Sequence, residues 1–417
     1  MYVNVTKMGI QVIKVISSIM GTGKTTRMFE MMKEMSDKRY IYISIFLDEV
    51  GNGNTGEAGR IQKALPEMNF RMPRNEGDGK VSSMKQLVHW GSNIATTHSL
   101  LRMFDKDVVD MIIEKEYTIV IDEAVDCIGL YDELSVGDVQ TLLESQQILV
   151  GEDSRVSWNH DKYGFDDVRY EDVVELADSG FLYLFGDHAL VTEYPPRLLK
   201  DAKDVVILSY LFEGSMMASW LKVNKVDYHY IDPSAIGLLP EIEVKKSIRD
   251  NLELVYSKEL HSKGYRDTAF SSTWFKNANS TQRRRVKKAL EACVNTHKCK
   301  RGEVFWTTFK PRRASLEGKG YTQKTSGGLD PFLPFNIKAI NSYSEFTMAM
   351  YAVNVYKHPT EIAYLKSRGV DFNQDTYALS ECLQFLWRGA IRQGKPMKVL
   401  IASKRMKKLV EDWLGEG

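Results

Sequence analysis

The sequence predicts an α/β protein built of two lobes, each with a mostly parallel sheet covered by helices. Short apolar runs rich in Val, Ile, Tyr and Phe alternate with longer segments of helical periodicity along the chain, which is the pattern of β-α-β units. The length of 417 residues also exceeds the usual size of one domain. The run DPSAIGLLP at 232–240 collects proline and glycine and marks a boundary, so we expect lobe 1 at 1–235 and lobe 2 at 236–417.

The strands of the first lobe are short apolar runs bounded by turn residues, as expected for strands buried in a parallel sheet. An acidic segment interrupts them, with 12 acidic and 5 basic residues between positions 151 and 201. We interpret residues from about 150 to 180 as an acidic insertion, and the glycine- and asparagine-rich segment 51–60 as a mobile loop. The expected strands are 11–18, 40–46, 93–98, 117–122, 204–211 and 226–231.

The alternation of strands and helices restarts after the boundary. The run STQRRRVKKALEACVNTH at 280–297 has the pattern of a capped helix with one basic side. The other expected elements of the second lobe are strands at 268–275, 303–309, 332–340 and 397–403, and helices around 378–392 and at 404–414.

The run SIMGTGKTT at 18–26 has the pattern of a loop that holds nucleotide phosphates. It follows an apolar strand and precedes a segment typical of a helix. Gly21 and Gly23 allow the backbone to curl so that successive N–H groups converge on phosphate at the helix N-terminus. Lys24 can reach the β- and γ-phosphates, and the Thr25 hydroxyl is placed to bind magnesium. The predicted phosphate-binding residues are Ser18, Gly21, Thr22, Gly23, Lys24, Thr25 and Thr26.

The run YTIVIDEA at 117–124 is an apolar strand that ends in two adjacent carboxylates, Asp122 and Glu123. Ligands bind at the carboxyl edge of the sheet in open α/β folds. We expect Asp122 to hold magnesium, directly or through water, and Glu123 to orient and deprotonate the attacking water. Together with the loop at 18–26, these carboxylates predict a site for ATP and Mg²⁺ that hydrolyses the triphosphate.

Basic residues are concentrated in the second lobe, although the net charge of the chain is only +1. From residue 245 to residue 313 there are 18 Lys and Arg against 6 Asp and Glu. Such an excess favours a polyanionic partner, and nucleic acid is the partner we predict. A solvated basic helix face is the alternative explanation.

The cysteine content favours a reducing compartment, because four scattered cysteines cannot form a disulfide framework. Cys293, His297 and Cys299 lie close in sequence but lack the fourth ligand of a structural zinc site. No stretch approaches the ~20 apolar residues of a membrane span, and the first residues lack the pattern of a signal peptide. We therefore expect a cytoplasmic protein with no membrane partner.

The run QFLWRGAIRQG at 384–394 is the main chemical signal of the second lobe. Arg388 and Arg392 are four residues apart, which would place both on one helix face, with Gln384 one turn before them. Arginines presented together suit a γ-phosphate supplied from across a cleft, where they would stabilise charge that develops during phosphoryl transfer. A surface helix whose arginines pair with acids or bind nucleic acid is the alternative.

These runs resemble the motifs of superfamily 2 helicases of the DEAD/DEAH type, and the resemblance covers the whole chain. Residues 18–26 resemble motif I, 120–124 motif II and 384–392 motif VI. In motif VI, Trp387 stands where the family usually has glycine, and Arg392 comes one residue late. The compact size resembles that of helicases encoded by double-stranded DNA phages. Weaker likenesses are 44–50 to motif Ia, 94–101 to the motif that contacts the nucleic-acid backbone, 207–212 to motif III, 270–275 to motif IV and 338–346 to motif V.

The resemblance implies two tandem RecA-like P-loop lobes with a nucleotide cleft between them, and ATP and Mg²⁺ as cofactors. It implies an ATP-dependent translocase or helicase that unwinds DNA in phage replication or recombination. The implied partners are single-stranded or fork DNA and replication or recombination proteins. Contacts to the DNA backbone would dominate, which makes binding sequence-tolerant and salt-dependent. The implied catalytic residues are Glu123, Lys24, Arg388, Arg392 and Gln384. The candidate nucleic-acid contacts are Thr96, Thr97 and His98 in lobe 1 and Thr273 and Trp274 in lobe 2, although core packing is an alternative role for Trp274.

Three other functions share part of this pattern. A DNA-packaging motor also joins a phosphate loop to an Asp-Glu pair, but typically adds a nuclease domain with clustered carboxylates. A DNA-stimulated ATPase can remodel protein–DNA complexes with the same motifs and without separating strands. A scaffold protein with a vestigial nucleotide pocket is disfavoured, because Lys24, Thr25, Asp122 and Glu123 are all present.

Overall fold

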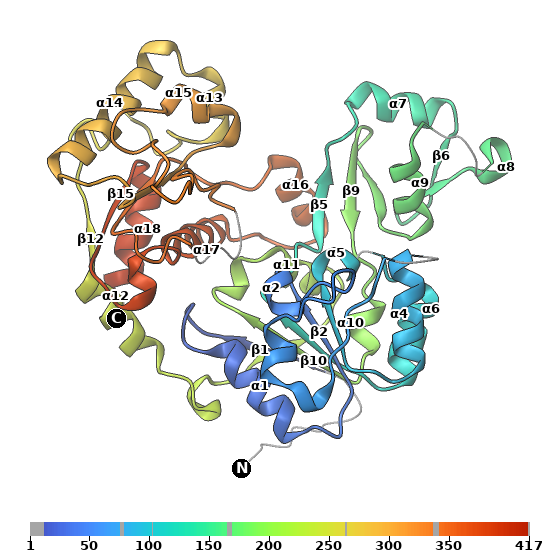
Figure 1. The fold of residues 1–417 in the computed structure, drawn as a ribbon. Helices are drawn as coiled ribbons and strands as arrows, with labels where there is room; N and C mark the ends of the chain where they lie inside the picture. The colour runs from blue at the N-terminus through green and yellow to red at the C-terminus, as the bar shows by residue number, and fades with distance from the viewer. Residues whose placement is uncertain are drawn as a thin grey trace. The chain divides into compact units, whose positions relative to one another are not determined.

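The computed structural model describes residues 12–75, 79–101, 103–164, 169–262, 265–336 and 342–415. The chain forms two compact units (Figure 1). Unit 1 contains Met1–Ser17, Lys24–Ile236 and Lys357–Phe372, and unit 2 contains Ser18–Gly23, Gly237–Tyr356 and Asn373–Gly417. The units differ from the predicted lobes 1–235 and 236–417 in two segments, since 357–372 returns to unit 1 and 18–23 is grouped with unit 2.

Unit 1 is built on a six-stranded sheet in the order β11-β1-β10-β4-β2-β3, and every pair of neighbouring strands is parallel. The α/β class with mostly parallel sheets is therefore confirmed. The strands are β1 (Ile13–Ser17), β2 (Tyr40–Ser44), β3 (Ile94–Thr97), β4 (Thr118–Asp122), β10 (Asp204–Ser209) and β11 (Tyr228–Tyr230). The helices are α1 (Lys24–Glu34), α2 (Leu47–Val50), α3 (Arg60–Ala64), α4 (Gly79–His89), α5 (His98–Leu101), α6 (Lys106–Glu114), α10 (Arg197–Asp201) and α11 (Met216–Val223).

Alternate residues of the strands face opposite sides of this sheet. Ile41 and Ile43 of β2 enter the same core as Leu87 of α4 and Ile112 of α6. Tyr42 lies on the other side, where its ring makes an edge contact with Phe29 of α1 at 5.4 Å between centroids. The sheet side covered by α1 is therefore the one that Tyr42 faces.

The acidic segment predicted at about 150–180 lies within a larger subdomain that connects β4 to β10 in unit 1 (Figure 1). Its three-stranded antiparallel sheet has the order β5-β9-β8, and β6 and β7 form a hairpin. Val139, Leu142 and Val173 contribute to a separate small core. The elements are β5 (Ile128–Tyr131), α7 (Val136–Glu144), β6 (Ile148–Val150), β7 (Val156–Trp158), α8 (His160–Tyr163), α9 (Glu171–Asp178), β8 (Leu182–Phe185) and β9 (Ala189–Glu193).

A buried carboxylate anchors α16 (Pro359–Ser367) within unit 1. Glu193, at the end of β9, is only 2% exposed. It accepts hydrogen bonds from the Tyr364 hydroxyl at 2.5 Å, from Arg368 at 3.3 Å and from the Asn224 side-chain amide at 3.0 Å. A buried charge is tolerated when several donors satisfy it, so this cluster explains why a segment from late in the sequence belongs to unit 1.

Unit 2 contains a four-stranded parallel sheet in the order β12-β15-β14-β13. Strands were correctly predicted at β13 (Val304–Thr307) and β15 (Met397–Ile401). The other elements are α12 (Glu241–Asn251), β12 (Leu252–Leu254), α13 (Ser272–Asn277), α14 (Ser280–Thr296), α15 (Arg313–Leu316), β14 (Met348–Tyr351), α17 (Gln374–Leu386) and α18 (Lys404–Gly415).

Two strand predictions in this unit were wrong. The segment 268–275 contains the start of α13, because the Ser271 hydroxyl caps a helix by accepting a hydrogen bond from the Trp274 N–H at 3.2 Å. In 332–340, only Phe332 forms a bridge, with Trp306, before the chain turns, and 337–340 lies outside the described residues. The neighbour of β13 in the sheet is therefore β14, which has a central position, and not the predicted strand 332–340.

Candidate phosphate and magnesium site

The predicted phosphate loop connects β1 to α1, and the helix begins at Lys24. Gly21 and Gly23 have φ values of 81° and 87°, a backbone region that favours glycine. The Ser18 hydroxyl donates to Thr22 Oγ1 at 3.0 Å, and the Thr22 hydroxyl donates to the Ile19 carbonyl at 2.9 Å. Ser18 therefore contributes to the internal hydrogen bonding of the loop.

The side chains of Thr25 and Asp122, predicted as the magnesium site, lie together in unit 1. The Thr25 hydroxyl is 3.0 Å and 3.2 Å from the two carboxylate oxygens of Asp122. Asp122 ends β4 and is 5% exposed, and Lys24 is 7% exposed. A hydroxyl and a carboxylate are oxygen donors of the kind that Mg²⁺ prefers, so the residues present fit the predicted ion.

Burial shifts the pKa values of both charged groups. Burial, and secondarily the charge of Glu123, raises the pKa of Asp122 to about 6. Burial also lowers the pKa of Lys24, and the charges of Glu123 and Asp122 oppose that shift. Both changes reflect the cost of keeping a charged group away from water. A bound cation beside Asp122 would favour its carboxylate form, which is the form that binds metal.

Glu123 follows β4 in an unusual backbone conformation. Its φ is 72°, which is uncommon for a residue with a side chain. The Glu123 N–H donates to the Leu208 carbonyl at 2.9 Å, extending the pairing of β4 with β10 by one residue. Such strain is held by the surrounding structure and costs about 1–3 kcal/mol. The backbone conformation of Glu123 sets the direction of its half-buried carboxylate, which is predicted to act on water.

Tyr42 is part of this site and was missed by the sequence analysis. Its hydroxyl donates to Asp122 Oδ2 at 2.6 Å, and both side chains are buried. This hydrogen bond opposes the rise in the pKa of Asp122. The period of two in β2 places Tyr42 on the face opposite Ile41 and Ile43, but it does not identify β4 as the adjacent strand, so the contact could not be found from the sequence.

Replacing Tyr42 with Phe is expected to destabilise the fold at pH 8, where Asp122 is ionised and loses a donor. The expected loss in the free energy of unfolding is about 1–3 kcal/mol, with a smaller loss at pH 5, where Asp122 is largely protonated. Urea unfolding in EDTA at both pH values measures the difference. Tyr40→Phe is the matched control, since Tyr40 bonds the Met35 carbonyl at 3.1 Å and its effect should not depend on pH. Equal losses for Tyr42→Phe at both pH values would contradict the interpretation.

A second missed group lies beside Thr26, which was predicted to bind phosphate. Arg60 donates to Thr26 Oγ1 at 2.6 Å and pairs with Glu49 at 3.2 Å. Its guanidinium also lies over the Phe29 ring, 5.6 Å from the centroid. Arg60 is the last residue of the segment 51–60, which was predicted to be a mobile loop. These contacts hold that end of the segment in place. Nothing in the glycine-rich pattern of that segment indicates this contact.

The predicted arginine helix in unit 2 is interrupted. The interpretation that 378–392 is one helix with Arg388 and Arg392 on one face was wrong, because α17 ends at Leu386 and a separate 3-10 turn spans Ala390–Gln393. The break lies at Gly389, where a Cβ would be 2.4 Å from Met397 Sδ. Gln384 is on α17, Arg388 is half-buried after it, and Arg392 is exposed on the turn.

The predicted nucleic-acid contacts differ in their accessibility. Thr96 is fully buried in β3, whereas Thr97 and His98 are half-buried where β3 ends and α5 begins. Thr273 is exposed on α13. The half-buried Trp274 packs in an aromatic cluster, with ring centroids 4.9 Å from Phe275 and 5.1 Å from Phe270, so packing accounts for much of its surface.

The basic helix is confirmed as α14, whose first turn is capped by Asn279 and Gln282. Arg284, Arg285 and Lys288 are exposed on it, while Val286 and Leu290 enter the core of unit 2. The helix thus presents a charged side to solvent, as the sequence predicts.

Comparison with known proteins identifies the family. Residues 246–414 match the YonV C-terminal Rossmann-like domain. The SPbeta prophage-derived protein YonV of Bacillus subtilis (strain 168) is 30% identical over 420 residues, which cover 96% of this chain and 98% of YonV. The chain belongs to the YonV family. In this YonV family member, the matched residues 246–414 include the four described strands of the unit 2 sheet and the region of Arg388 and Arg392.

Among solved structures, S. tokodaii Xpd4 is similar to this YonV family member, with a TM-score of 0.49 and 13% sequence identity. The similarity covers 97% of this chain and 94% of Xpd4. Across the described residues, no helix is both long enough and apolar enough to cross a membrane.

Proposed function

We propose that this YonV family member is a nucleic-acid-dependent ATPase that acts as a translocase or helicase of superfamily 2. The observation that carries the proposal is the arrangement of Thr25 and Asp122 at the carboxyl end of a parallel sheet, with the buried Lys24 next to Thr25 in the sequence. A buried lysine, a hydroxyl and a carboxylate after a glycine loop are the parts that bind a nucleoside triphosphate with Mg²⁺.

In this proposal each residue has a defined task. Residues 18–26 bind the phosphates, and Lys24 neutralises charge on the β- and γ-phosphates. Thr25 and Asp122 would hold Mg²⁺, which supplies charge neutralisation at the phosphates. Glu123 orients the attacking water and accepts its proton. Tyr42 keeps the Asp122 carboxylate in position through its hydrogen bond.

The nucleic-acid part of the proposal rests on charge. The exposed basic side of α14 suits a phosphate backbone, and the relative in B. subtilis derives from a prophage. We propose single-stranded or fork DNA as the partner, in phage replication or recombination. Arg388 and Arg392 would stabilise the transferring phosphoryl group, with Arg392 supplied by the 3-10 turn and not by the helix.

The test is ATP hydrolysis by the full chain with and without single-stranded DNA. Turnover is expected to rise on addition of DNA, and Lys24→Ala is expected to lower it by about a hundredfold or more. Lys33→Ala, a change to an exposed lysine near the other end of α1, is the control and should leave turnover unchanged. Turnover that is changed neither by DNA nor by Lys24→Ala would refute the proposal. Strand displacement on a tailed duplex then separates a helicase from a remodelling ATPase.

A further inference from the structure

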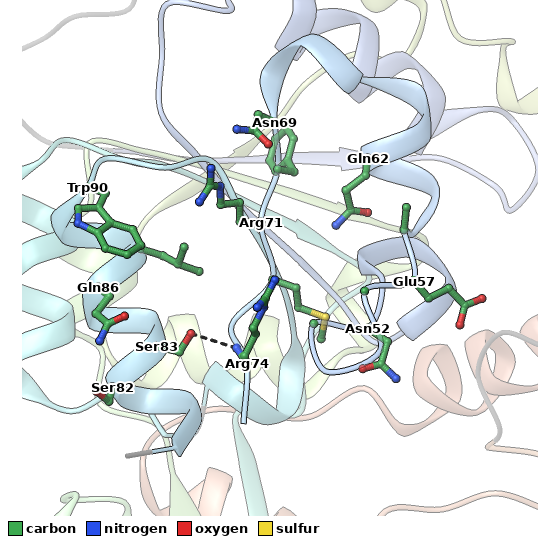
Figure 2. Close-up of a pocket in the computed structure, with 16 residues that line it drawn as sticks. Asn52, Glu57, Gln62, Asn69, Arg71, Arg74, Ser82, Ser83, Gln86 and Trp90 are labelled. Carbon is green, nitrogen blue, oxygen red and sulfur yellow. Dashed lines mark hydrogen bonds between the residues drawn. The ribbon is translucent and has the colours of Figure 1, made fainter. Parts of the chain in front are cut away.

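A cavity in unit 1 shares no lining residue with the proposed ATP site. Its volume is about 750 Å³, and it lies between the segment 52–58, residues 69–74 and helix α4 (Figure 2). Figure 2 shows Trp90 and Gln86 on one side and Gln62 and Asn52 on the other, with Arg71 and Arg74 between them. The cavity therefore has an aromatic wall, a carboxamide wall and two guanidinium groups.

Backbone hydrogen bonds hold all three sides of this cavity. Arg71 continues the sheet beside β3, because its N–H donates to the Asn93 carbonyl and its carbonyl accepts from the Ala95 N–H, both at 2.9 Å. The Arg74 N–H donates to the Ser83 hydroxyl of α4 at 3.0 Å. A site fixed in this way needs little reorganisation to bind a ligand.

The segment 52–58 also has a defined conformation. The Asn52 N–H donates to the Glu57 carbonyl at 2.8 Å, and the Asn52 carbonyl accepts from the Gly56 N–H at 2.9 Å. The Asn52 side chain accepts from the Asn54 N–H at 3.1 Å. The glycine-rich segment is thus a hydrogen-bonded turn that forms one wall of the cavity.

The lining side chains match the chemistry of a nucleotide. Trp90 is 65% exposed, and an open indole face stacks on any base. Arg71 and Arg74 are also exposed, and guanidinium groups bind phosphate in a bidentate manner. Carboxamides such as Gln62 and Gln86 match the donor and acceptor edges of bases.

One lining group carries an unused acceptor. The Gln62 side-chain N–H donates to the Val50 carbonyl at 2.7 Å, which fixes the amide. Its Oε1 atom is buried and accepts no hydrogen bond within the part of the chain that the structure describes. Buried polar atoms normally have a partner, and an N–H donor of a bound base, such as N3–H of thymine, would supply one.

We propose that this cavity binds one nucleotide of a single strand, with its base on Trp90 and its phosphate at Arg71 and Arg74. The inference rests on the proposed function, because it assigns part of the path of the nucleic acid on unit 1. The solvent-exposed indole allows a base to enter without leaving its strand, which favours a strand over a free nucleotide. The ligand class is therefore a nucleoside phosphate within single-stranded nucleic acid.

The test is binding of fluorescein-labelled oligothymidylate to the full chain, without ATP, by anisotropy. Trp90→Ala is expected to weaken binding by about five- to a hundredfold, as expected for loss of one stacked base, and Trp90→Phe should recover much of it. Tyr230→Ala is the control, because Tyr230 is also an exposed aromatic side chain, at 46%, but lies on β11 of unit 1, outside the cavity and outside the basic segment 245–313. Oligonucleotides with 5-iododeoxyuridine should photo-cross-link to Trp90, as mapped by mass spectrometry.

Each outcome bears on a different claim. DNA-stimulated ATP hydrolysis combined with unchanged binding by Trp90→Ala and no cross-link at Trp90 would overturn the cavity assignment and leave the proposed function intact. A cross-link that free thymidine monophosphate abolishes at equal nucleotide concentration would indicate a mononucleotide site and also overturn it. Loss of the cross-link and of affinity in Trp90→Ala, but not in the control variant, supports the assignment. It does so even if Lys24→Ala hydrolyses ATP normally.

Discussion

Replacing Glu123 with Gln is expected to lower the turnover number for ATP hydrolysis by about 10²–10⁴-fold, the usual contribution of a general base. Glutamine preserves the size of the side chain and its backbone N–H bond to Leu208 but cannot accept the proton of water. The strained φ of 72° is retained as well, so the variant isolates chemistry from folding. Affinity for ATP should change little, because phosphate binding is assigned to other residues.

Steady-state hydrolysis and equilibrium binding of a fluorescent ATP analogue measure the two effects separately. Asp126→Asn is the matched control, since Asp126 is a carboxylate three residues later in the same segment with 59% side-chain exposure. It should hydrolyse ATP like the unaltered protein. Normal turnover by Glu123→Gln would assign water activation to another group and leave Glu123 with a structural task at the end of β4.

The α/β class could be predicted because its signals are local. The apolar runs at β1, β2, β4 and β10 are short, β-branched and fully bounded by turns, and each forms a parallel strand. The glycine loop between β1 and α1, which is predicted to bind phosphate, could be placed for the same reason, because its glycines, Lys24 and Thr25 are close together in sequence. The pairing of Thr25 with Asp122 followed from a general rule, that strand ends meet at one edge of a parallel sheet.

The contacts that were missed depend on which distant parts of the chain become neighbours. Tyr42 reaches Asp122 because β2 pairs with β4 in the register Tyr42↔Val120, and no local pattern encodes that pairing. Arg60 reaches Thr26 only after the chain has turned through α2. Long-range position, not residue type, was the missing information in both cases.

The wrong predictions in unit 2 arose from competition between local signals. Residues 268–275 are apolar enough for a strand, but the Ser271 cap and the need to pack Phe275 in the core select a helix. In the arginine segment, helical spacing suggested one continuous helix. Gly389 instead lies against Met397 and Phe305, where no larger residue fits, and the chain breaks there.

Replacing Asp122 with Asn is expected to stabilise the metal-free protein at pH 8 while removing ATP hydrolysis. The pKa of Asp122 is raised from 3.8 to about 6 in the folded state, so the folded protein binds the proton more tightly than the unfolded chain. Ionisation of Asp122 therefore costs stability, and the cost grows as the pH rises from about 4 to 6 and is complete above that range. A shift of this size corresponds to about 3 kcal/mol.

The uncharged Asn avoids this cost but loses the attraction between Asp122 and Lys24, so we expect a net gain of about 1–3 kcal/mol in the free energy of unfolding at pH 8. Glu123 remains to interact with Lys24, and the Asn carbonyl can still accept the Tyr42 hydroxyl. Urea unfolding in EDTA should show the full gain at pH 8 and only about a third of it at pH 4.5, where Asp122 is protonated in the folded state but mostly ionised in the unfolded chain. If the variant is less stable than the unaltered protein at pH 8, the favourable interactions of the Asp122 carboxylate in the fold outweigh the cost of burying its charge. A gain would instead mean that the protein tolerates an unfavourable buried charge at the position proposed to bind magnesium, and Tyr42→Phe should then shift stability in the opposite direction.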